Sequence, residues 1–438
     1  MRYLSRLFQP VITIPKNAKI KNTEITCKSQ KLLLECGLIR PSTSGLFTIL
    51  PLAQRALDKL VSHIRSCIEQ AGAQRMSLPC LTAASLWDRT GRLQDVGPEL
   101  MKFEDRHGKK FLLAPTHEEA LADLLADVGP LSYKQLPLLL YQISNKYRDE
   151  QRPKHGMLRA REFCMLDAYG AHAHAHHALH TYEAVSQAYT TLFHMLQLNV
   201  YRVAAPSGDM GGSISHEWQL PAPAGEDQLS VCQNCSHATL DNCDKCQKCG
   251  ENIQTVNSIE VGHTFILGTK YSAPLEAHYT PAAGPTEPIV MSCYGIGITR
   301  LLAAALEALS TDKSLRWPKL IAPYSLCIIG PKEGSHEWQS HGWESICKLH
   351  DHIATTTELK GDILIDDRHH MTIGKRLMMA ERMGYPYILV CGKHTADTPP
   401  RYELHSINTR QHSVQLLTEE QLGQYLRGDQ RDQIYNVQ

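Results

Sequence analysis

The 438-residue sequence lacks any long apolar run. No stretch approaches the roughly 18 consecutive apolar residues that a membrane-spanning helix needs. The sequence also lacks a net charge, because Lys and Arg together number 45 and so do Asp and Glu. A nucleic-acid ligand would favour a basic bias, so any nucleic-acid surface must be a local patch. With 42% hydrophobic and 21% charged residues, the composition is that of a globular protein with room for two or three domains.

Acidic residues are missing from the first 23 positions. The charged side chains there are all basic: Arg2, Arg6, Lys16, Lys19 and Lys21. A basic, acid-poor beginning is typical of a mitochondrial targeting segment. We therefore expect residues 1–24 to be such a segment and the protein to act in the mitochondrial matrix. The alternative is a frayed basic N-terminus.

A secretory signal of the usual kind is also missing, although the chain has 14 cysteines. This combination favours reduced thiols or metal ligands over a disulfide framework. Two Cys-x-x-Cys pairs lie between Pro221 and Val256 and match a four-thiolate zinc site: Cys232, Cys235, Cys246 and Cys249. Cys243 is a fifth, spare cysteine in the same stretch. The alternative to zinc is a loop of reduced thiols.

The central stretch of the chain predicts an antiparallel hairpin. A strand from Leu138 to Tyr147 is followed by a charged loop over residues 149–156 and a return strand from Met157 to Tyr169. Such a hairpin can hold a planar ring against Phe163 and a phosphate against Arg148. Arginine suits phosphate because its planar fork stays charged and can bind two oxygens at once.

A second stretch predicts a partner for this hairpin. A glycine-spaced strand from Cys293 runs into an apolar helix over Leu301–Leu309, with Arg300 at the junction. Two fixed arginines around one nucleotide are what an adenylating site requires.

These two stretches resemble motifs 2 and 3 of the class II aminoacyl-tRNA synthetases, and specifically the bacterial-type prolyl-tRNA synthetases in their shorter mitochondrial form. Further similar signatures follow in the family's order at residues 114–119, 159–163, 211–217 and 260–263, and the likeness runs from about Gly37 to Gly392. The resemblance implies an α/β chain. We expect an α+β catalytic domain over residues 25–320, with an antiparallel sheet and helices, and then a small βαβαβ anticodon-binding domain over residues 321–438.

The resemblance also implies an activity and its ligands. We expect a proline–tRNA ligase that uses ATP and Mg²⁺ to form prolyl-adenylate and then charges tRNA(Pro). Arg148 would bridge the α-phosphate and the substrate carboxylate, Phe163 would stack on adenine and Arg300 would grip the γ-phosphate. The remaining ATP-binding residues would be Glu150, Gly295 and Gly297. The proline-binding residues would be Thr116, Glu118, Asp167 and His216.

Some of these positions have a second interpretation. Thr116 with Glu119 is also a helix capping box before the apolar run Ala120–Leu125, which leaves Glu118 free for substrate. The helical pattern over Ala53–Ile68 resembles motif 1, which forms the dimer interface in the family and implies a homodimer, but it also fits a core helix. In the C-terminal domain, Arg368 and Lys375 would contact the anticodon, or form a solvated helix face.

Long bacterial-type members carry a large editing domain between motifs 2 and 3. Here a short cysteine-rich insert, residues 228–252, lies at that position instead. We therefore expect some alanine to be attached to tRNA(Pro) and not removed by this chain.

Two other functions remain open. A relative specific for threonine, histidine or glycine would share the fold, but its signatures differ around residues 116–119 and 211–217. A catalytically silent, RNA-binding paralogue without enzyme activity would be expected to lack Arg148, Glu150 or Arg300, and all three are present.

Overall fold

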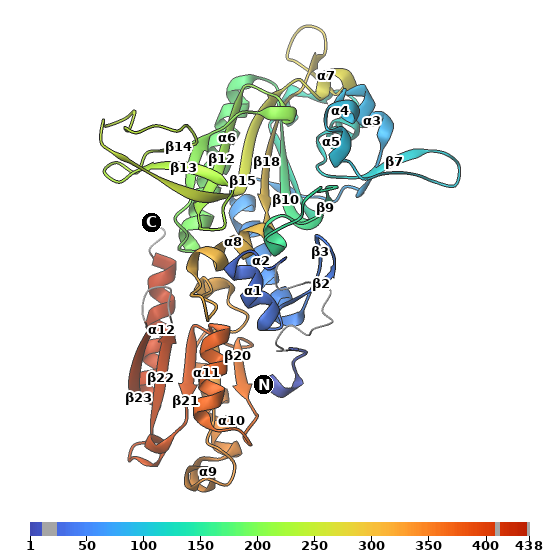
Figure 1. The fold of residues 1–438 in the computed structure, drawn as a ribbon. Helices are drawn as coiled ribbons and strands as arrows, with labels where there is room; N and C mark the ends of the chain where they lie inside the picture. Colours follow the sequence, from blue (N-terminus) through green and yellow to red (C-terminus); the bar gives the residue numbers. More distant parts are fainter. Residues whose placement is uncertain (11–23, 408–411, 436–438) are drawn as a thin grey trace.

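A computed structural model describes residues 1–10, 24–407 and 412–435 of the chain. The molecule is elongated, with a large sheet-and-helix part above a smaller α/β part (Figure 1). The larger part contains most of the first 320 residues, and the smaller part contains the C-terminal residues together with the first few residues of the chain. In the described part of the chain, none of the helices has the length and apolar character that crossing a membrane requires.

The larger part is built on a nine-stranded sheet in which all pairs but one are antiparallel. The predicted hairpin forms two neighbouring strands toward one end of the sheet's main path. Its return strand begins at Glu162 rather than Met157 because Gly156–Leu158 form a short 3-10 helix. The main path runs β11 (Tyr201–Ala204), β12 (Ile214–Pro221), β15 (Ile253–Gly268), β18 (Val290–Gly297), β10 (Glu162–His172), β9 (Leu138–Tyr147) and β4 (Gln74–Arg75).

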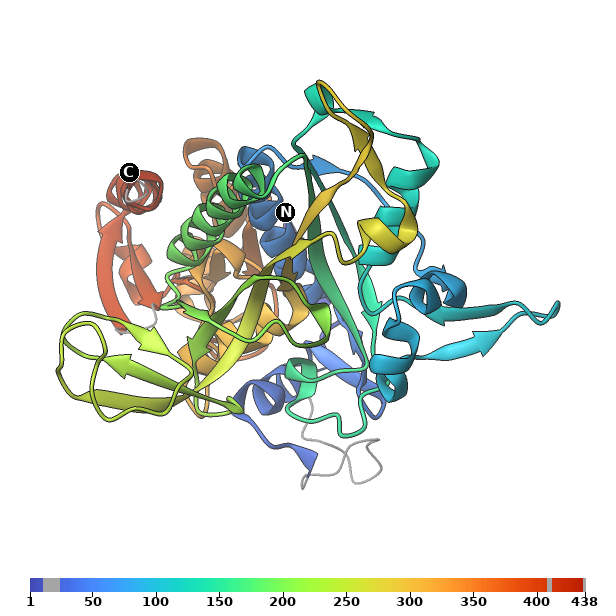
Figure 2. The same cartoon turned by 90° about the horizontal axis from the view of Figure 1, so that it is seen from above.

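Long helices cover one face of this sheet (Figures 1 and 2). They are α1 (Lys28–Glu35), α2 (Pro51–Gln70), α6 (Ala175–Met195) and α8 (Ile298–Leu309). Helix α2 starts with Pro51 in its first turn, where the missing N–H is not needed, and buries its apolar stripe within the same chain. The opposite face is partly covered by short helices: α3 (Ala84–Arg89), α4 (Arg92–Asp95), α5 (Glu118–Asp127) and α7 (Ser272–Leu275).

Two hairpin arms extend from opposite sides of the larger part (Figure 2). One is formed by β6 (Lys102–Glu104) and β7 (Lys110–Leu113), with β5 (Leu81–Ala83) beside β7. The other is the cysteine-rich insert, in which β13 (Asp227–Cys232) pairs with β14 (Ala238–Thr239) and with the start of β15. Smaller pairings complete this part: β2 (Ile39–Thr43) with β3 (Leu46–Ile49), and β8 (Leu131–Ser132), β16 (His278–Thr280) and β17 (Glu287–Pro288) in a small sheet.

The C-terminal part contains the predicted βαβαβ unit. Parallel strands β20, β19 and β21 lie side by side and are connected by α10 and α11. The sequence did not predict the next element, an antiparallel pair, β22 and β23, that continues the sheet beyond β21. The bounds are β19 (Leu326–Ile329), α9 (His336–His341), α10 (Trp343–Thr356), β20 (Ile363–Asp366), α11 (Ile373–Met383), β21 (Tyr387–Val390), β22 (Arg401–Ile407), β23 (His412–Thr418) and α12 (Glu419–Tyr435).

The first residues of the chain lie on this C-terminal part. Strand β1 (Arg2–Tyr3) pairs in parallel with β20, and the ring of Tyr3 lies 5.4 Å from that of Trp343. The backbone N–H of Ser5 donates to Asp367 at 2.8 Å. The greater part of the predicted targeting segment, residues 11–23, lies outside the described residues. Its beginning forms an edge strand of a domain more than 300 residues away in the sequence.

Candidate active site

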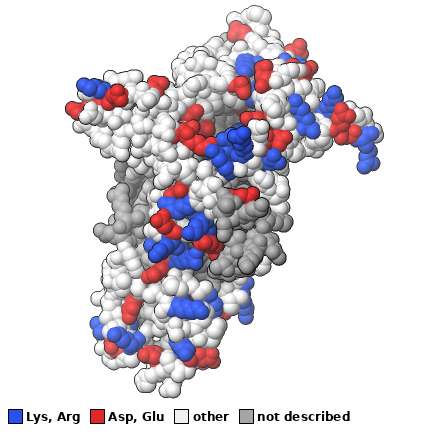
Figure 3. Space-filling view, viewed as in Figure 1, with Lys and Arg blue, Asp and Glu red and all other residues white. Residues whose placement is uncertain are grey.

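A cavity of about 400 Å³ opens on the face of the large sheet that the long helices leave free. It is within the usual size range of small-molecule sites. Charged side chains of both signs gather around a hollow in the upper half of the molecule (Figure 3). The walls come from β10, β12, β15 and β18, from the start of α5, from the loop before β12 and from Arg148 after β9.

Strand alternation decides which side chains reach the cavity. In the antiparallel ladder, Asp167 of β10 faces Gly295 of β18, Gly295 faces His263 of β15, and His263 faces Glu217 of β12. Residues paired in this way lie on the same face of the sheet. All four line the cavity, so one row across four strands forms its floor.

Two arginines lie at one end of the cavity. The guanidinium carbon of Arg148 lies 5.3 Å from the centre of the Phe163 ring. Arg300 donates through Nε to the Leu158 carbonyl at 3.0 Å, which fixes its direction. Burial and the nearby positive charge of Arg300 lower the pKa of Arg148, although an arginine stays protonated at neutral pH. Two fixed cations that repel each other favour an anion between them.

Both glycines predicted for the nucleotide site line the cavity as well. A Cβ atom at Gly295 would have its nearest neighbours among the described residues at 3.9 Å, so packing does not require glycine there. The missing side chain keeps the floor of the cavity open. At Gly297 a Cβ would come within 3.3 Å of the Cβ of Arg300 and would crowd that side chain.

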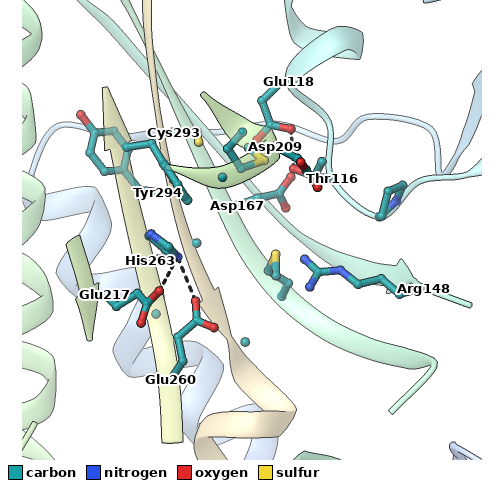
Figure 4. A pocket seen from close by; sticks show the side chains of 18 of the residues that line it. Thr116, Glu118, Arg148, Asp167, Asp209, Glu217, Glu260, His263, Cys293 and Tyr294 are labelled. Atoms are coloured by element: carbon teal, nitrogen blue, oxygen red, sulfur yellow. Dashed lines mark hydrogen bonds and ion pairs between the residues drawn. The ribbon is translucent and has the colours of Figure 1, made fainter. Parts of the chain in front are cut away.

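An acidic cluster of Glu217 and Glu260 lies around His263 on two adjacent strands (Figure 4). Arg300 Nη1 is 3.6 Å from Glu260 Oε2. His263 Nδ1 is 3.0 Å from Glu260 Oε1 and 3.9 Å from Glu217 Oε1. Burial and the charge of Glu260 raise the pKa of Glu217. Burial also acts to raise the pKa of Glu260, but the His263 hydrogen bond and the charge of Arg300 outweigh it, and the net shift is downward. Two adjacent carboxylates with opposed pKa shifts are suited to hold a divalent cation.

Thr116 and Glu118 form the opposite end of the cavity (Figure 4). The Thr116 hydroxyl donates to Glu118 Oε2 at 2.6 Å, and Glu118 is only 2% exposed. The predicted capping box is wrong, because α5 starts at Glu118 and its N-cap is His117 without a side-chain cap. Thr116 is used to hold Glu118 instead, and Glu119 forms an ion pair with Arg92.

Asp167 also lines the cavity, but its carboxylate already has several partners. Oδ1 accepts from Lys146 Nζ at 2.7 Å, and Oδ2 accepts from Gln142 at 3.0 Å and from the Tyr169 hydroxyl at 2.8 Å. Burial acts to raise the pKa of Asp167, but His117 and Lys146 outweigh it and the net shift is downward. Asp167 therefore belongs to a charge-neutral buried network that supports the cavity floor.

Two predicted site residues lie away from the cavity walls. His216 points to the helix-covered face of the sheet, where its Nδ1 is 2.7 Å from the Tyr182 hydroxyl. The prediction that His216 contacts the substrate is corrected by strand alternation, because its neighbour Glu217 faces the cavity. Glu150 lies in the hairpin loop outside the cavity lining, and its Oε2 is 2.8 Å from Arg159 Nε.

The two predicted anticodon residues differ in their surroundings. Arg368 forms a two-pronged ion pair with Asp366, at 2.9 Å and 2.6 Å, so its guanidinium already has a partner. Lys375 is exposed in the first turn of α11. Of these two cations, Lys375 has the side chain that is available to a ligand.

The four predicted zinc ligands come together at the tip of the insert. The Sγ atoms of Cys232 and Cys249 are 3.4 Å apart, those of Cys235 and Cys246 are 3.6 Å apart, and all four lie within 4.8 Å of one another. Four thiolates around zinc are spaced by about 3.8 Å, given Zn–S bonds of about 2.3 Å. The backbone N–H of Lys248 donates to the sulfur of Cys246. The donor set fits zinc, and Cys243 is not part of it.

Sequence reasoning missed four side chains of the site: Arg92, Lys146, Glu217 and Glu260. Glu217 and Glu260 lie within stretches that were quoted for the resemblance, and alternation on their strands could have placed Glu217 on the cavity face. Arg92 and Lys146 gave no local signal, because their partners lie 27 and 21 residues further along the chain.

Comparison with known families defines the class of this fold. Residues 101–309 match the model of the tRNA synthetase class II core domain for the G, H, P, S and T enzymes, and residues 351–428 match the model of an anticodon binding domain. The chain therefore combines a class II synthetase core with an anticodon-binding domain, as the sequence predicted.

Similar proteins narrow the class further. A human protein described as "Probable proline--tRNA ligase, mitochondrial" is 44% identical over 93% of this chain and 87% of its own length. The proline--tRNA ligase of Sulfurimonas denitrificans is 35% identical over 89% and 92%. A prolyl-tRNA synthetase structure from Giardia lamblia superposes with a TM-score of 0.77 over 94% of this chain and 78% of that one at 18% identity, which supports the fold alone. The chain belongs to the class II prolyl-tRNA synthetase family.

Proposed function

We propose that this protein is a proline–tRNA ligase that makes prolyl-adenylate from proline and ATP and then transfers the prolyl group to tRNA(Pro). The family membership supports this activity. The observation that carries it at the level of chemistry is a single cavity with two fixed arginines at one end and a buried Thr116–Glu118 pair at the other. An amino acid between them would have its carboxylate toward the arginines and its ammonium group toward Glu118.

The first step forms a bond between a carboxylate oxygen of proline and the α-phosphorus of ATP, and breaks the bond from that phosphorus to pyrophosphate. Positioning and charge stabilisation are the main requirements. Arg148 would bind the carboxylate and the α-phosphate together, and Arg300 would bind the γ-phosphate. The adenine ring would stack on Phe163. Glu150, which lies in the hairpin loop, would accept a hydrogen bond from the amino group of adenine. Gly295 and Gly297 would let the nucleotide approach the sheet.

The ammonium group of proline would be bound by Glu118 and Thr116. Asp167 was expected to bind it, but its oxygens accept from Lys146, Gln142 and Tyr169. Its proposed role is therefore to keep the adjacent floor rigid. The negative carboxylate of Glu118 would attract the positively charged nitrogen of proline. The hydrogen bond that Thr116 donates at 2.6 Å fixes the orientation of this carboxylate.

Glu217 and Glu260 would hold Mg²⁺. The two carboxylates lie side by side, next to the arginine end of the cavity. The negative charge of Glu260 opposes ionisation of Glu217, and a bound cation would relieve this repulsion. When bound, Mg²⁺ would offset the charge on the phosphate oxygens. His263 would orient Glu260 through the bond at its Nδ1, while Ser215 lies 2.6 Å from its Nε2.

Zinc would be held by Cys232, Cys235, Cys246 and Cys249. We propose a structural role, because the cluster lies at the tip of an arm outside the cavity and all four positions of a tetrahedral ion would be filled by protein. The ion would fasten the loops after β13 and before β15 to each other.

The C-terminal domain would bind the anticodon of tRNA(Pro), with Lys375 as one phosphate contact. A homodimer is proposed from the resemblance of α2 to motif 1, although its apolar stripe is used within the chain. The mitochondrial matrix is the proposed location, supported by mitochondrial relatives and by the basic, acid-free first 23 residues.

ATP–pyrophosphate exchange tests the proposed activity. The purified protein is assayed with each of the twenty amino acids in turn. Proline should drive exchange, with alanine a weak second. Exchange driven by threonine, histidine or glycine would contradict the substrate. No exchange with any amino acid, from folded protein with zinc bound, would favour the silent RNA-binding paralogue.

A further inference from the structure

A buried arginine lies directly behind the proposed ammonium site. Arg92, at the start of α4, is 3% exposed. Its Nη1 donates to both oxygens of Glu119 at 3.0 Å and 3.1 Å, and lies 3.6 Å from Glu118 Oε2. One guanidinium therefore contacts two consecutive carboxylates of α5.

The surroundings of Arg92 hold it in one position. Its guanidinium carbon lies 4.5 Å from the centre of the Trp87 ring and 5.4 Å from that of Tyr271. Its Nη2 donates to the sulfur of Met210 at 3.2 Å. Thr90 donates to Glu119 from the other side at 3.1 Å. Aromatic faces and carboxylates together offset the cost of burying the charge.

The charges in this end of the cavity do not cancel. Glu118 and Glu119 carry two negative charges when ionised, and Arg92 carries one positive charge. Beside them, Asp167 lies 2.7 Å from Lys146 and 3.4 Å from His117 Nδ1, and the exposed Asp209 also lines the cavity. The three buried groups Arg92, Glu118 and Glu119 therefore leave one excess negative charge in a region shielded from water. Such a site favours a cation and disfavours a neutral ligand of the same shape.

We propose that Arg92 is a positioning residue for amino-acid recognition, which neutralises Glu119 and fixes Glu118 so that the single excess charge faces the substrate's ammonium group. The inference rests on the proposed function. It adds Arg92, which lies outside the stretches that carry the family resemblance. Arg92 borders the cavity with only 3% of its surface exposed, and its guanidinium is directed to the two carboxylates. Its effect would pass through Glu118, whose Oε2 it shares with Thr116.

Removing the cation tests this role. Arg92→Gln leaves two buried acids without a cation, so they retain one shared proton at neutral pH. The total stays at one negative charge, but that charge is divided between Glu118 and Glu119 instead of being held at Glu118. The KM for proline should rise at least tenfold at pH 7 and should fall again as the pH is raised. The KM for ATP should stay within twofold. Arg89→Gln, an exposed arginine of the neighbouring helix α3, is the matched control and should change neither value.

Glu119→Gln covers the case in which Arg92→Gln does not fold. The amide can still accept from Arg92, but the excess charge becomes zero, because Arg92 now pairs with Glu118 alone. The KM for proline should rise about tenfold without the pH trend of Arg92→Gln. The double variant Arg92→Gln/Glu119→Gln restores one excess charge, and its pH profile should return to that of the unchanged protein.

A neutral analogue separates charge from structure. Tetrahydro-2-furoic acid has a ring oxygen in place of the ammonium group of proline. Its inhibition constant should not rise in Glu119→Gln, because loss of the excess charge weakens the binding of a cation and not that of a neutral ligand. An equal loss of affinity for proline, ATP and this analogue would show a purely structural role for the ion pair and overturn the inference. Failure of the unchanged protein to exchange with proline would instead overturn the proposed function.

Discussion

At the scale of single residues, the cavity is divided by charge. Arg148 and Arg300 lie at one end, Glu118 lies at the other, and the Lys146–Asp167 pair lies between them as a neutral support. This arrangement matches an amino acid and a phosphate chain laid end to end. In the proposed mechanism fixed charges act and no nucleophilic side chain is needed, so the contribution of each charge should be measurable by replacing its side chain.

Arg148→Ala should reduce proline-dependent pyrophosphate exchange by about 10³-fold. The variant loses charge-assisted hydrogen bonds to two groups, each worth about 1.5–3 kcal/mol, and a tenfold rate change corresponds to about 1.4 kcal/mol. The thermal midpoint should change little, since no ion pair of Arg148 with another described residue is broken. Arg106→Ala, exposed in the β6–β7 arm, serves as control. Retained exchange in Arg148→Ala would show that this residue is not the phosphate ligand.

At the scale of single elements, strand β10 carries both side chains of the site and a buried histidine. His172, at the end of β10, is fully buried, and its Nε2 lies 3.0 Å from the hydroxyl of Ser292 on β18. Gly170 is required between them, because a Cβ there would lie 2.3 Å from both atoms. This contact joins the two strands that carry Asp167 and Gly295.

Burial lowers the pKa of His172 to about 4, whereas an unfolded histidine has a pKa of about 6.5. The stabilisation from neutral His172 is fully present above pH 6.5 and is lost as the pH falls toward 4. It should amount to about 3 kcal/mol of unfolding free energy over this range. Denaturant unfolding at several pH values should show this slope in the unchanged protein and in the exposed control His180→Gln. The slope should be smaller in His172→Gln, and an identical slope would contradict a buried neutral imidazole.

The cysteine-rich arm should contain one zinc ion per chain. Metal analysis of the purified protein should show it, and Cys246→Ser should lose it, because only three thiolates remain. Protease cleavage within residues 232–252 should then become at least about tenfold faster, since the ion is proposed to fasten these loops. Cys243→Ser is the internal control and should keep both the zinc and the resistance. Zinc retained equally in Cys246→Ser would exclude this ligand set.

At the scale of the whole molecule, the short insert between β12 and β15 affects how accurately the protein would select proline over alanine. Residues 222–252 form only the cysteine-rich arm and its connections. A pocket that accepts the proline ring also admits the smaller alanine, because a few methylene groups provide only about 1–3 kcal/mol of discrimination. We expect alanyl-tRNA(Pro) to form and to persist. Incubation of pre-made alanyl-tRNA(Pro) with the purified protein checks this, and rapid release of alanine would show that the chain has a second, hydrolytic site.

The N-terminal edge strand connects the beginning of the chain to the C-terminal domain. Tyr3→Ala should lower the stability of this domain by about 1–2 kcal/mol, because the contact between Tyr3 and the Trp343 ring is lost. Tryptophan fluorescence during thermal unfolding reports on this neighbourhood. Phe8→Ala, from a side chain that is 66% exposed, is the control. Equal behaviour of the two variants would mean that β1 adds nothing to the fold, as expected if residues 1–24 act only as a targeting segment.

The sequence by itself determined the family, the domain order and most of the elements that carry the site. Local periodicity was enough for α2, α8, β9 and the βαβαβ unit, because helices and strands are set by neighbouring residues. The two arginines and two glycines predicted for the nucleotide site occur in continuous motifs, and all four line the cavity.

Only the tertiary structure decided which side chains meet. His216 and Glu217 differ by one residue, yet they lie on opposite faces of β12, because register and alternation across four strands decide the face. Asp167 was expected in the site from the resemblance and lines the cavity, but its ion pair with Lys146 on another strand is visible only in the fold. Arg92 and β1 depend on contacts over 27 and more than 300 residues, and such contacts follow from the packing of whole elements, which no local pattern records.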